Sequence, residues 1–363
     1  MHSRAFAFTV ALSTAIIAIL LTFTFSHVAA TLKVDEQEAL RSLVAQVSEE
    51  INTSAKTLAA QAELAAHMPP LGRAVAAGTP EALTALMGES YAVLAKKYGV
   101  AVGQVNGVNG NVLFRFHEPA VRGDDFTRSR RIIVAAHASL QPQSGIEIGS
   151  SGVRVRGAAP VSHEGTLVGS IEFGQELGPL LETLKARTNA DFAVVIDRRL
   201  LNVRPGTPEA NVFGNLRGDS GTNWPLVAKL SELGKIALVK EPVFSFATLN
   251  GMTYGSVSSP LLDYSGSEIG VVVAAKSFNA NGRSLRQLAI SLIAGGIIAE
   301  IGIVAIILLV FRGMVLRPVA IVAKAAEAAA EGAAAVDLPK AGTVAEVNAL
   351  IASVKRLREK VTS

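Results

Sequence analysis

Side chains able to bind a small anion gather before the midpoint of the chain. Residues 111–118 alternate between apolar and polar side chains, so a strand there places Arg115 and His117 on one face. Arginine offers a carboxylate a planar pair of donors, and two cation-capable groups on one sheet face therefore suit a small anion. Arg154 and Arg156 share a face in the same way. The charged residues of this stretch are Arg115, His117, Asp124, Asp125, Arg130, Arg131, Glu147, Arg154, Arg156 and Glu172.

The competing interpretation is an ordinary solvated strand face. Asp124 and Asp125 would then pair with Arg130 and Arg131 in a surface salt-bridge cluster. His117 could also bind a metal ion, but the other histidines of this region show no ligand spacing. Those histidines are His67, His137 and His163.

Composition and motifs exclude several other chemistries. The chain has no cysteine, which rules out disulfides, thiolate metal sites and cysteine nucleophiles. Its 34 basic and 30 acidic side chains are too evenly balanced to argue for nucleic acid. It contains no Gly-x-Ser-x-Gly elbow, phosphate loop or His-Glu-x-x-His motif. The sequence therefore predicts a protein that is not an enzyme, with no cofactor and no metal.

A strongly apolar segment, Leu288–Phe311, is long enough to cross a membrane once as a helix. Its large apolar side chains favour insertion by roughly 6 kcal/mol, against ~3 kcal/mol for its single charge, Glu300. A carboxylate within a membrane is a candidate functional residue. The small residues Ser291, Gly295 and Ala299 lie beside it and favour close helix packing. A dimer interface is therefore expected ahead of a proton or ion pathway.

A second uncharged segment, Ala5–Ser26, lies near the N-terminus. It is longer than the ~7–15 apolar residues of a signal peptide, which favours an uncleaved anchor over a cleaved signal. The basic residues at the outer ends of the two segments outnumber those just before the second, so both termini are predicted to be cytoplasmic. The flanking residues are Arg4, Arg312, Arg317 and Lys324 against Arg283 and Arg286. Residues 28–287 would then be periplasmic, in a protein of the bacterial inner membrane.

The segment Leu32–His67 predicts one long stalk helix, because apolar residues recur about every 3.5 positions until Met68-Pro69-Pro70. That apolar stripe either packs on the helix's own domain or forms a dimer seam. A second helix is expected from an N-cap at Thr79 to Tyr98.

Strands and short helices follow in two α+β modules. Strands are expected at 100–105, 111–116, 145–148, 153–161, 166–173, 191–197, 243–249, 252–258 and 268–275. Helices are expected at 128–140, 176–188 and 224–233.

This order of elements resembles the double-Cache sensor domains of bacterial chemoreceptors and sensor kinases, whose modules are PAS-like. The resemblance is sharpest in LFRFHEPAVRGDDFTRSRRIIVAAH, SGIEIG, VRVRGAAPV and GTLVGSIEFG, between Leu113 and Gly174. It implies a small-molecule pocket in the membrane-distal module. The ligand-binding residues that we expect are Arg115, His117, Asp125, Arg130, Arg131, Glu147 and Arg156.

The C-terminal segment resembles a HAMP linker domain. Pro318 lies just beyond the second membrane segment, as a proline does at the head of the first HAMP helix. A second apolar stripe begins near Ala345-Glu346-Val347-Asn348, which keeps a Glu of the family pattern but lacks its Gly. The resemblance implies a parallel homodimer that forms a four-helix bundle. Glu300, Pro318 and Glu346 are the expected signal-relay residues.

The predicted organisation has six parts. They are a stub with membrane helix one (1–27), a stalk helix (28–67), a membrane-distal module (68–197), a membrane-proximal module (198–280), membrane helix two (288–311) and a HAMP-like domain (312–363). The predicted function is a dimeric receptor, embedded in membrane lipid, that senses a small anionic metabolite. It is either a truncated receptor or one that signals through a separate cytoplasmic partner. The alternative is a membrane-anchored adaptor that binds a protein.

Overall fold

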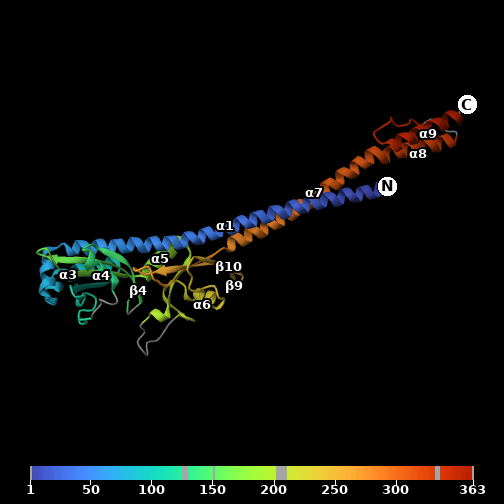
Figure 1. Cartoon of the computed structure of the whole chain (residues 1–363). Coiled ribbons are helices and arrows are strands. Elements are labelled where there is room, and N and C mark those ends of the chain that lie inside the picture. Colours follow the sequence, from blue (N-terminus) through green and yellow to red (C-terminus); the bar gives the residue numbers. More distant parts are fainter. Residues whose placement is uncertain (1, 125–129, 150–151, 202–210, 332–335, 362–363) are drawn as a thin grey trace. The chain divides into compact units, whose positions relative to one another are not determined.

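The computed structural model describes the whole chain except residues 1, 125–129, 150–151, 202–210, 332–335 and 362–363 (Figure 1). The chain folds into two compact units. The first is Leu32–Gly282, and the second joins Met1–Thr31 to Arg283–Ser363.

The first sheet has five antiparallel strands in the order β2-β1-β5-β4-β3. Its strands are β1 (Val100–Gly107), β2 (Val112–Arg115), β3 (Gln143–Gly149), β4 (Gly152–His163) and β5 (Thr166–Glu176). The helices of this module are α2 (Pro69–Ala77), α3 (Pro80–Tyr98) and α4 (Arg131–Ser139). The expected strands and the helix after Thr79 are confirmed. Helix α2 was missed, because the prolines that end the preceding helix also begin this one.

The second sheet has the order β7-β8-β6-β11-β10-β9, and its neighbouring strands are again antiparallel. Its strands are β6 (Asp191–Asp197), β7 (Val212–Phe213), β8 (Leu216–Gly221), β9 (Val243–Leu249), β10 (Met252–Leu262) and β11 (Glu268–Ser277). The helices are α5 (Leu177–Thr188), the 3₁₀ turn η1 (Arg198–Leu200) and α6 (Trp224–Glu232).

The predicted module boundary at residue 197 is wrong for β6. That strand was expected to end the first module, but it pairs with β8 and β11 in the second sheet. An apolar run such as DFAVVID is suited to the centre of either sheet, and only long-range pairing decides between them. The strands β7 and β8 were not predicted.

The long helix α1 (His2–Ala66) ends before the two prolines, as expected. Within the first unit its apolar stripe is buried against both sheets, so this stripe packs on its own domain. Gly157 on β4 allows the close approach, because a Cβ there would lie 2.1 Å from the backbone nitrogen of Ala59. The buried stripe residues are Leu40, Leu43, Val44, Val47, Ile51, Leu58 and Ala62.

The second unit contains the N-terminal part of α1, most of helix α7 (Asn279–Phe311), the π-helical turn η2 (Arg312–Leu316), α8 (Arg317–Ala330) and α9 (Ala345–Val361). The first four residues of α7 belong to the first unit. Two of the described helices, α1 and the helix that begins with α7, carry windows long and apolar enough to cross a membrane, with mean hydropathies of 2.3 and 2.7. Gly296 faces α1 closely, because a Cβ there would lie 2.7 Å from Cδ1 of Leu21.

Candidate ligand-binding site

One face of the first sheet buries polar side chains, and the other face is apolar. Strand register places Gln104 opposite both Arg115 and Glu172, and Glu147 opposite Arg154, so these residues share a face. The alternate positions, such as Val105, Phe114 and Phe173, pack in the apolar core with α1. We define the polar cluster as the eight buried residues Gln104, Asn106, Arg115, Arg130, Glu147, Arg156, Ser170 and Glu172.

Glu172 is at the centre of the polar cluster and is completely buried. Arg156 donates a short hydrogen bond to its Oε1, and Nη1 of Arg130 lies 3.7 Å from the same oxygen. The other oxygen accepts a hydrogen bond of 2.8 Å from Nε2 of Gln104. Gln104 also donates to Asn106, which in turn donates to Ser170. Amide and hydroxyl groups therefore connect the central carboxylate to neighbouring strands.

Helix α4 brings the remaining charges of the polar cluster to the sheet. The N–H of Ile132, in the first turn of α4, donates a hydrogen bond of 2.9 Å to Oε1 of Glu147 on β3. A carboxylate suits this place, because the first N–H groups of a helix have no partner within the helix. Arg130, directly before α4, has its Nη1 3.8 Å from Oε2 of Glu147. Both of its ion pairs with the glutamates are thus longer than a hydrogen bond.

Burial and neighbouring charges shift the protonation equilibria of this cluster in different directions. Burial, followed by repulsion from Arg156, lowers the pKa of Arg130 to about 10. Burial and the nearby Glu172 raise the pKa of Glu147. Burial alone would also raise the pKa of Glu172, but Arg156 and Arg130 hold it below its ordinary value. Glu172 is therefore the ionised partner, and Glu147 is the carboxyl that most readily takes up a proton.

Two arginines at the edge of the cluster pair with carboxylates that are about half exposed. Arg115 donates a hydrogen bond of 2.5 Å to Asp124 and one of 3.1 Å to the carbonyl of Val121. Backbone bonds from Val112 hold Gly123 and Asp124 beside β2. Arg154 forms an ion pair of 2.9 Å with Glu176. Both carboxylates are therefore accessible to solvent at the edge of the polar cluster.

His117 lies just beyond the end of β2 and is half-buried. Its Nδ1 is 3.1 Å from the carbonyl oxygen of Gly103. Burial lowers the pKa of His117, although the Gly103 carbonyl opposes this change. The neutral ring is therefore the favoured form beside the arginines.

The structure brings most of the predicted ligand-binding residues together. Arg115, Arg130, Glu147 and Arg156 belong to the polar cluster, and His117 is at its edge. Arg131 is exposed and is not part of the polar cluster, although it lines a cavity of about 400 Å³ together with Glu147. Asp125 lies outside the described residues.

Sequence reasoning missed Gln104, Asn106 and Ser170 and left Glu172 without a role. The usable signal was a polar residue at every second position within otherwise apolar strands, as in Gln104-Val105-Asn106 and Ser170-Ile171-Glu172.

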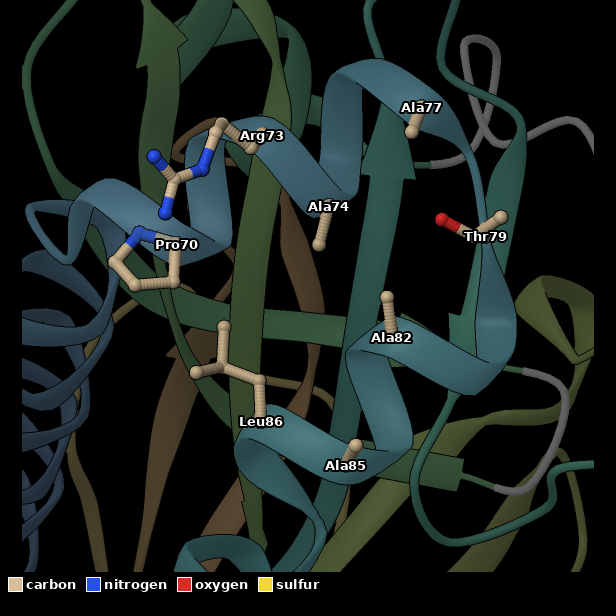
Figure 2. A pocket seen from close by; sticks show the side chains of 8 residues that line it. All are labelled: Pro70, Arg73, Ala74, Ala77, Thr79, Ala82, Ala85 and Leu86. Atoms are coloured by element: carbon tan, nitrogen blue, oxygen red, sulfur yellow. The ribbon is translucent and has the colours of Figure 1, made fainter.

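A groove elsewhere in the same module offers different chemistry. A groove of about 490 Å³ lies between α2 and α3, and Figure 2 shows the side chains that line it. Four of its eight lining residues are alanines, and Arg73 is the only charged one. Such a groove has few groups that could orient a polar metabolite. The polar cluster is therefore the better candidate site.

The predicted relay residues all lie in the second unit. Oε1 of Glu300 lies 2.9 Å from the hydroxyl of Ser13 and 3.0 Å from that of Thr14, so this carboxyl bonds within its own chain. Its expected role at a dimer interface stays a prediction. Pro318 is near the start of α8, directly after the π-helical turn. Glu346 is in the first turn of α9.

Residues 33–280 match the family model described as the double sensory domain of two-component sensor kinases. The sensory domain of the Campylobacter jejuni chemoreceptor Tlp3, solved with isoleucine bound, is 13% identical with a TM-score of 0.43. That match covers 70% of this chain and 96% of the Tlp3 domain.

The extracellular domain of the putative histidine kinase vpHK1S-Z8 is 15% identical with a TM-score of 0.44, over 72% of this chain and 99% of that domain. The sensor domain of the Vibrio cholerae histidine kinase DctB is 13% identical with a TM-score of 0.40, over 68% and 97%. No curated protein matches the chain significantly. The family match covers more than half of the chain, and the chain therefore belongs to the double sensory domain (dCache_3) family of two-component sensor kinases.

Proposed function

We propose that this chain is a transmembrane receptor that binds a small anionic metabolite in its polar cluster. The observation that carries the proposal is one sheet face that buries three arginines, Arg115, Arg130 and Arg156, together with two glutamates. A bound carboxylate would add negative charge and hydrogen-bond acceptors at this point. Binding rather than catalysis is the role that we propose.

The edge of the polar cluster supports the same ligand chemistry. An anion could take the place of the half-exposed Asp124 carboxylate on the planar donors of Arg115. The neutral form of Glu147 would limit repulsion and would also offer a donor. A ligand with one or two carboxylates is therefore favoured over a cation.

We propose a two-pass topology in the bacterial inner membrane. The apolar windows of α1 and α7 support two crossings, and the basic residues at their outer ends support cytoplasmic termini. Under this topology the sensory domain is periplasmic. Helix α7 then carries the signal inward.

We propose that α8 and α9 form a HAMP-like relay in a parallel homodimer. Thr343, before α9, contacts Met314, before α8, and Arg358 near the end of α9 bonds to Val336, beyond α8. These contacts at both ends support a parallel pair. Val322, Ala325 and Val354 pack between the helices, while Leu350 and Leu357 remain exposed. A second copy would cover these leucines, and a separate cytoplasmic partner would read the bundle.

Ligand binding can be tested with the full chain in lipid nanodiscs. A panel of monocarboxylates, dicarboxylates and inorganic phosphate would be screened by thermal shift, and positive compounds measured by calorimetry. Arg115→Ala should remove the response to every positive compound, and Arg115→Lys should weaken it because the planar fork is lost. Arg187→Ala is the matched control, since Arg187 forms an exposed ion pair with Glu50 outside the cluster. Unchanged binding by Arg115→Ala would show that the assigned site is wrong.

A further inference from the structure

We propose that Tyr264 is a positioning residue that couples the polar cluster to helix α7. Tyr264 lies in the turn between β10 and β11, in the second module, yet it forms hydrogen bonds with strand β3 of the first sheet. The proposal deepens the proposed function, which supplies ligand binding as the input. Its contacts and its test do not depend on the identity of the ligand.

Tyr264 holds β3 at three points. Its N–H donates a hydrogen bond of 2.8 Å to the carbonyl of Ile146. Its hydroxyl donates one of 2.6 Å to Oε1 of Gln143. Its ring covers Gly145, where a Cβ would lie only 3.1 Å from Cδ2 of the ring. Strand β3 is at the edge of its sheet, so its outward-facing carbonyl is available to this turn.

The same strand carries part of the polar cluster. Glu147 directly follows Ile146, and its carboxylate accepts from the first turn of α4. Gln143 donates from its amide nitrogen to Ser139, the last residue of α4. Strand β3 is therefore bonded to both ends of α4. A ligand that changes the position or charge of Glu147 would act on the segment that Tyr264 holds.

The turn that carries Tyr264 is internally braced. Oδ1 of Asp263 accepts from the N–H groups of Ser265 and Ser267 and from the Ser265 hydroxyl. The N–H of Asp263 donates to the carbonyl of Ser267, and Gly266 takes the positive φ of 79° that the turn requires. A turn bonded in this way would transmit a displacement rather than absorb it.

The segment that joins this turn to α7 consists of one strand and a single further residue. Strand β11 begins at Glu268, right after the turn, and α7 begins at Asn279, with Phe278 as the single residue between them. Phe278 is buried, and its N–H donates to the carbonyl of Thr253 on β10. No flexible linker separates the turn from α7 along these described residues.

A second contact between the modules serves as an internal comparison. Asp219 on β8 accepts a hydrogen bond of 2.9 Å from the N–H of Val153. It holds the start of β4, but β8 continues toward α6 and not toward α7. Asp219 therefore joins the modules without lying on the path to the membrane.

Hydrogen exchange on the full chain in nanodiscs tests the coupling without any ligand. Glu147→Gln imitates the protonated carboxyl and serves as the input. We expect it to change exchange in the turn at 263–267 and in the first turn of α7 by about threefold or more. In the Tyr264→Phe background this response should fall to half or less, because the bond to Gln143 is lost. Tyr264→Ala should abolish it, because the ring contact is lost as well.

Two control variants decide the interpretation. Tyr254→Phe removes a hydroxyl from β10 of the same module, outside this contact, and should leave the response intact. Asp219→Ala should also preserve it. A response that persists unchanged in Tyr264→Phe and Tyr264→Ala, or that is absent from the chain with Glu147→Gln alone, would overturn the inference. Loss of binding in Arg115→Ala concerns the ligand site only, so the two proposals can fail separately.

Discussion

In the first sheet, the face opposite α1 buries three arginines and two glutamates. In the second sheet, the corresponding face buries small and branched apolar side chains, among them Ala193, Val195, Val271 and Val273. Helix α6 covers that face with Leu226, Val227 and Leu230. The two antiparallel sheets therefore bury chemically different side chains on their corresponding faces. Buried charges are costly unless they are paired, and the second sheet has one among its described residues, Asp197 at the end of β6, which pairs with Arg199. The concentration of buried charges on the first sheet supports the proposed site there.

The helices that cover these two faces begin in different ways. The first turn of α6 is capped by the side chain of the preceding residue, Asn223, which accepts from the N–H of Leu226. The first turn of α4 is instead capped from a distant strand, by Glu147 of the polar cluster. The start of α4 is therefore sensitive to the state of the candidate site, whereas the start of α6 is closed locally.

Breaking the ion pair between Arg156 and Glu172 should cause the largest loss of stability. Arg156→Leu leaves the buried Glu172 without its closest cation, and we expect a loss of about 3–5 kcal/mol in the free energy of unfolding. Urea denaturation of the full chain in nanodiscs would measure it. Arg187→Leu, which breaks an exposed pair, should cost at most ~1 kcal/mol. Equal losses in the two variants would contradict the central role of Arg156.

Truncating a core side chain of the second module should lower stability without changing ligand affinity. Leu230→Ala truncates a fully buried side chain, with an expected loss of about 3 kcal/mol. Binding of a positive carboxylate should remain within about twofold at temperatures where the chain stays folded, because no residue of the polar cluster is touched. Calorimetry beside the denaturation series would check both values. Loss of binding without unfolding would show that the second module also shapes the site.

The pH dependence of binding should come from the first module. Because burial and Glu172 raise the pKa of Glu147, anion affinity should be highest below that raised pKa and should fall as Glu147 ionises. One linked proton allows a fall of at most about tenfold per pH unit. Calorimetry across a pH series would measure this slope, and Glu147→Gln should flatten it. A slope that survives in Glu147→Gln would assign the titration to another group.

Glu147 and Glu172 should contribute opposite pH dependences to the free energy of unfolding. The raised pKa of Glu147 contributes stability at low pH that is lost as pH rises through its value in the folded chain. The pKa of Glu172, held down by Arg156 and Arg130 despite its burial, contributes stability at higher pH that is lost as pH falls through its folded value. Denaturation of Glu147→Gln and the parent chain at several pH values would separate the two contributions.

The smallest effect should come from the local cap of α6. Asn223→Ala removes the acceptor for the Leu226 N–H and should cost about 1 kcal/mol in the free energy of unfolding. Its effect on carboxylate affinity should be negligible, unlike that of Glu147→Gln at the corresponding helix start. Similar changes in affinity for both variants would remove the functional distinction between the two caps.

Local patterns in the sequence determined most of the secondary structure. The period of two in the strands, the prolines after α1 and the glycine after α3 were sufficient, because propensity and side-chain alternation act over a few residues. They also placed Arg115 on one face and Phe114 on the other, and they marked both apolar helices.

Only the tertiary structure decided which segments meet. The neighbours Arg130 and Arg131 look equivalent in the sequence, yet one is buried and the other exposed because α4 begins between them. Three further features depend on contacts between separate elements of the chain. They are the pairing of β6 in the second sheet, the cap of α4 by Glu147 and the hydrogen bonds of Tyr264 to β3. Such contacts depend on how whole elements pack, and no short-range pattern encodes them.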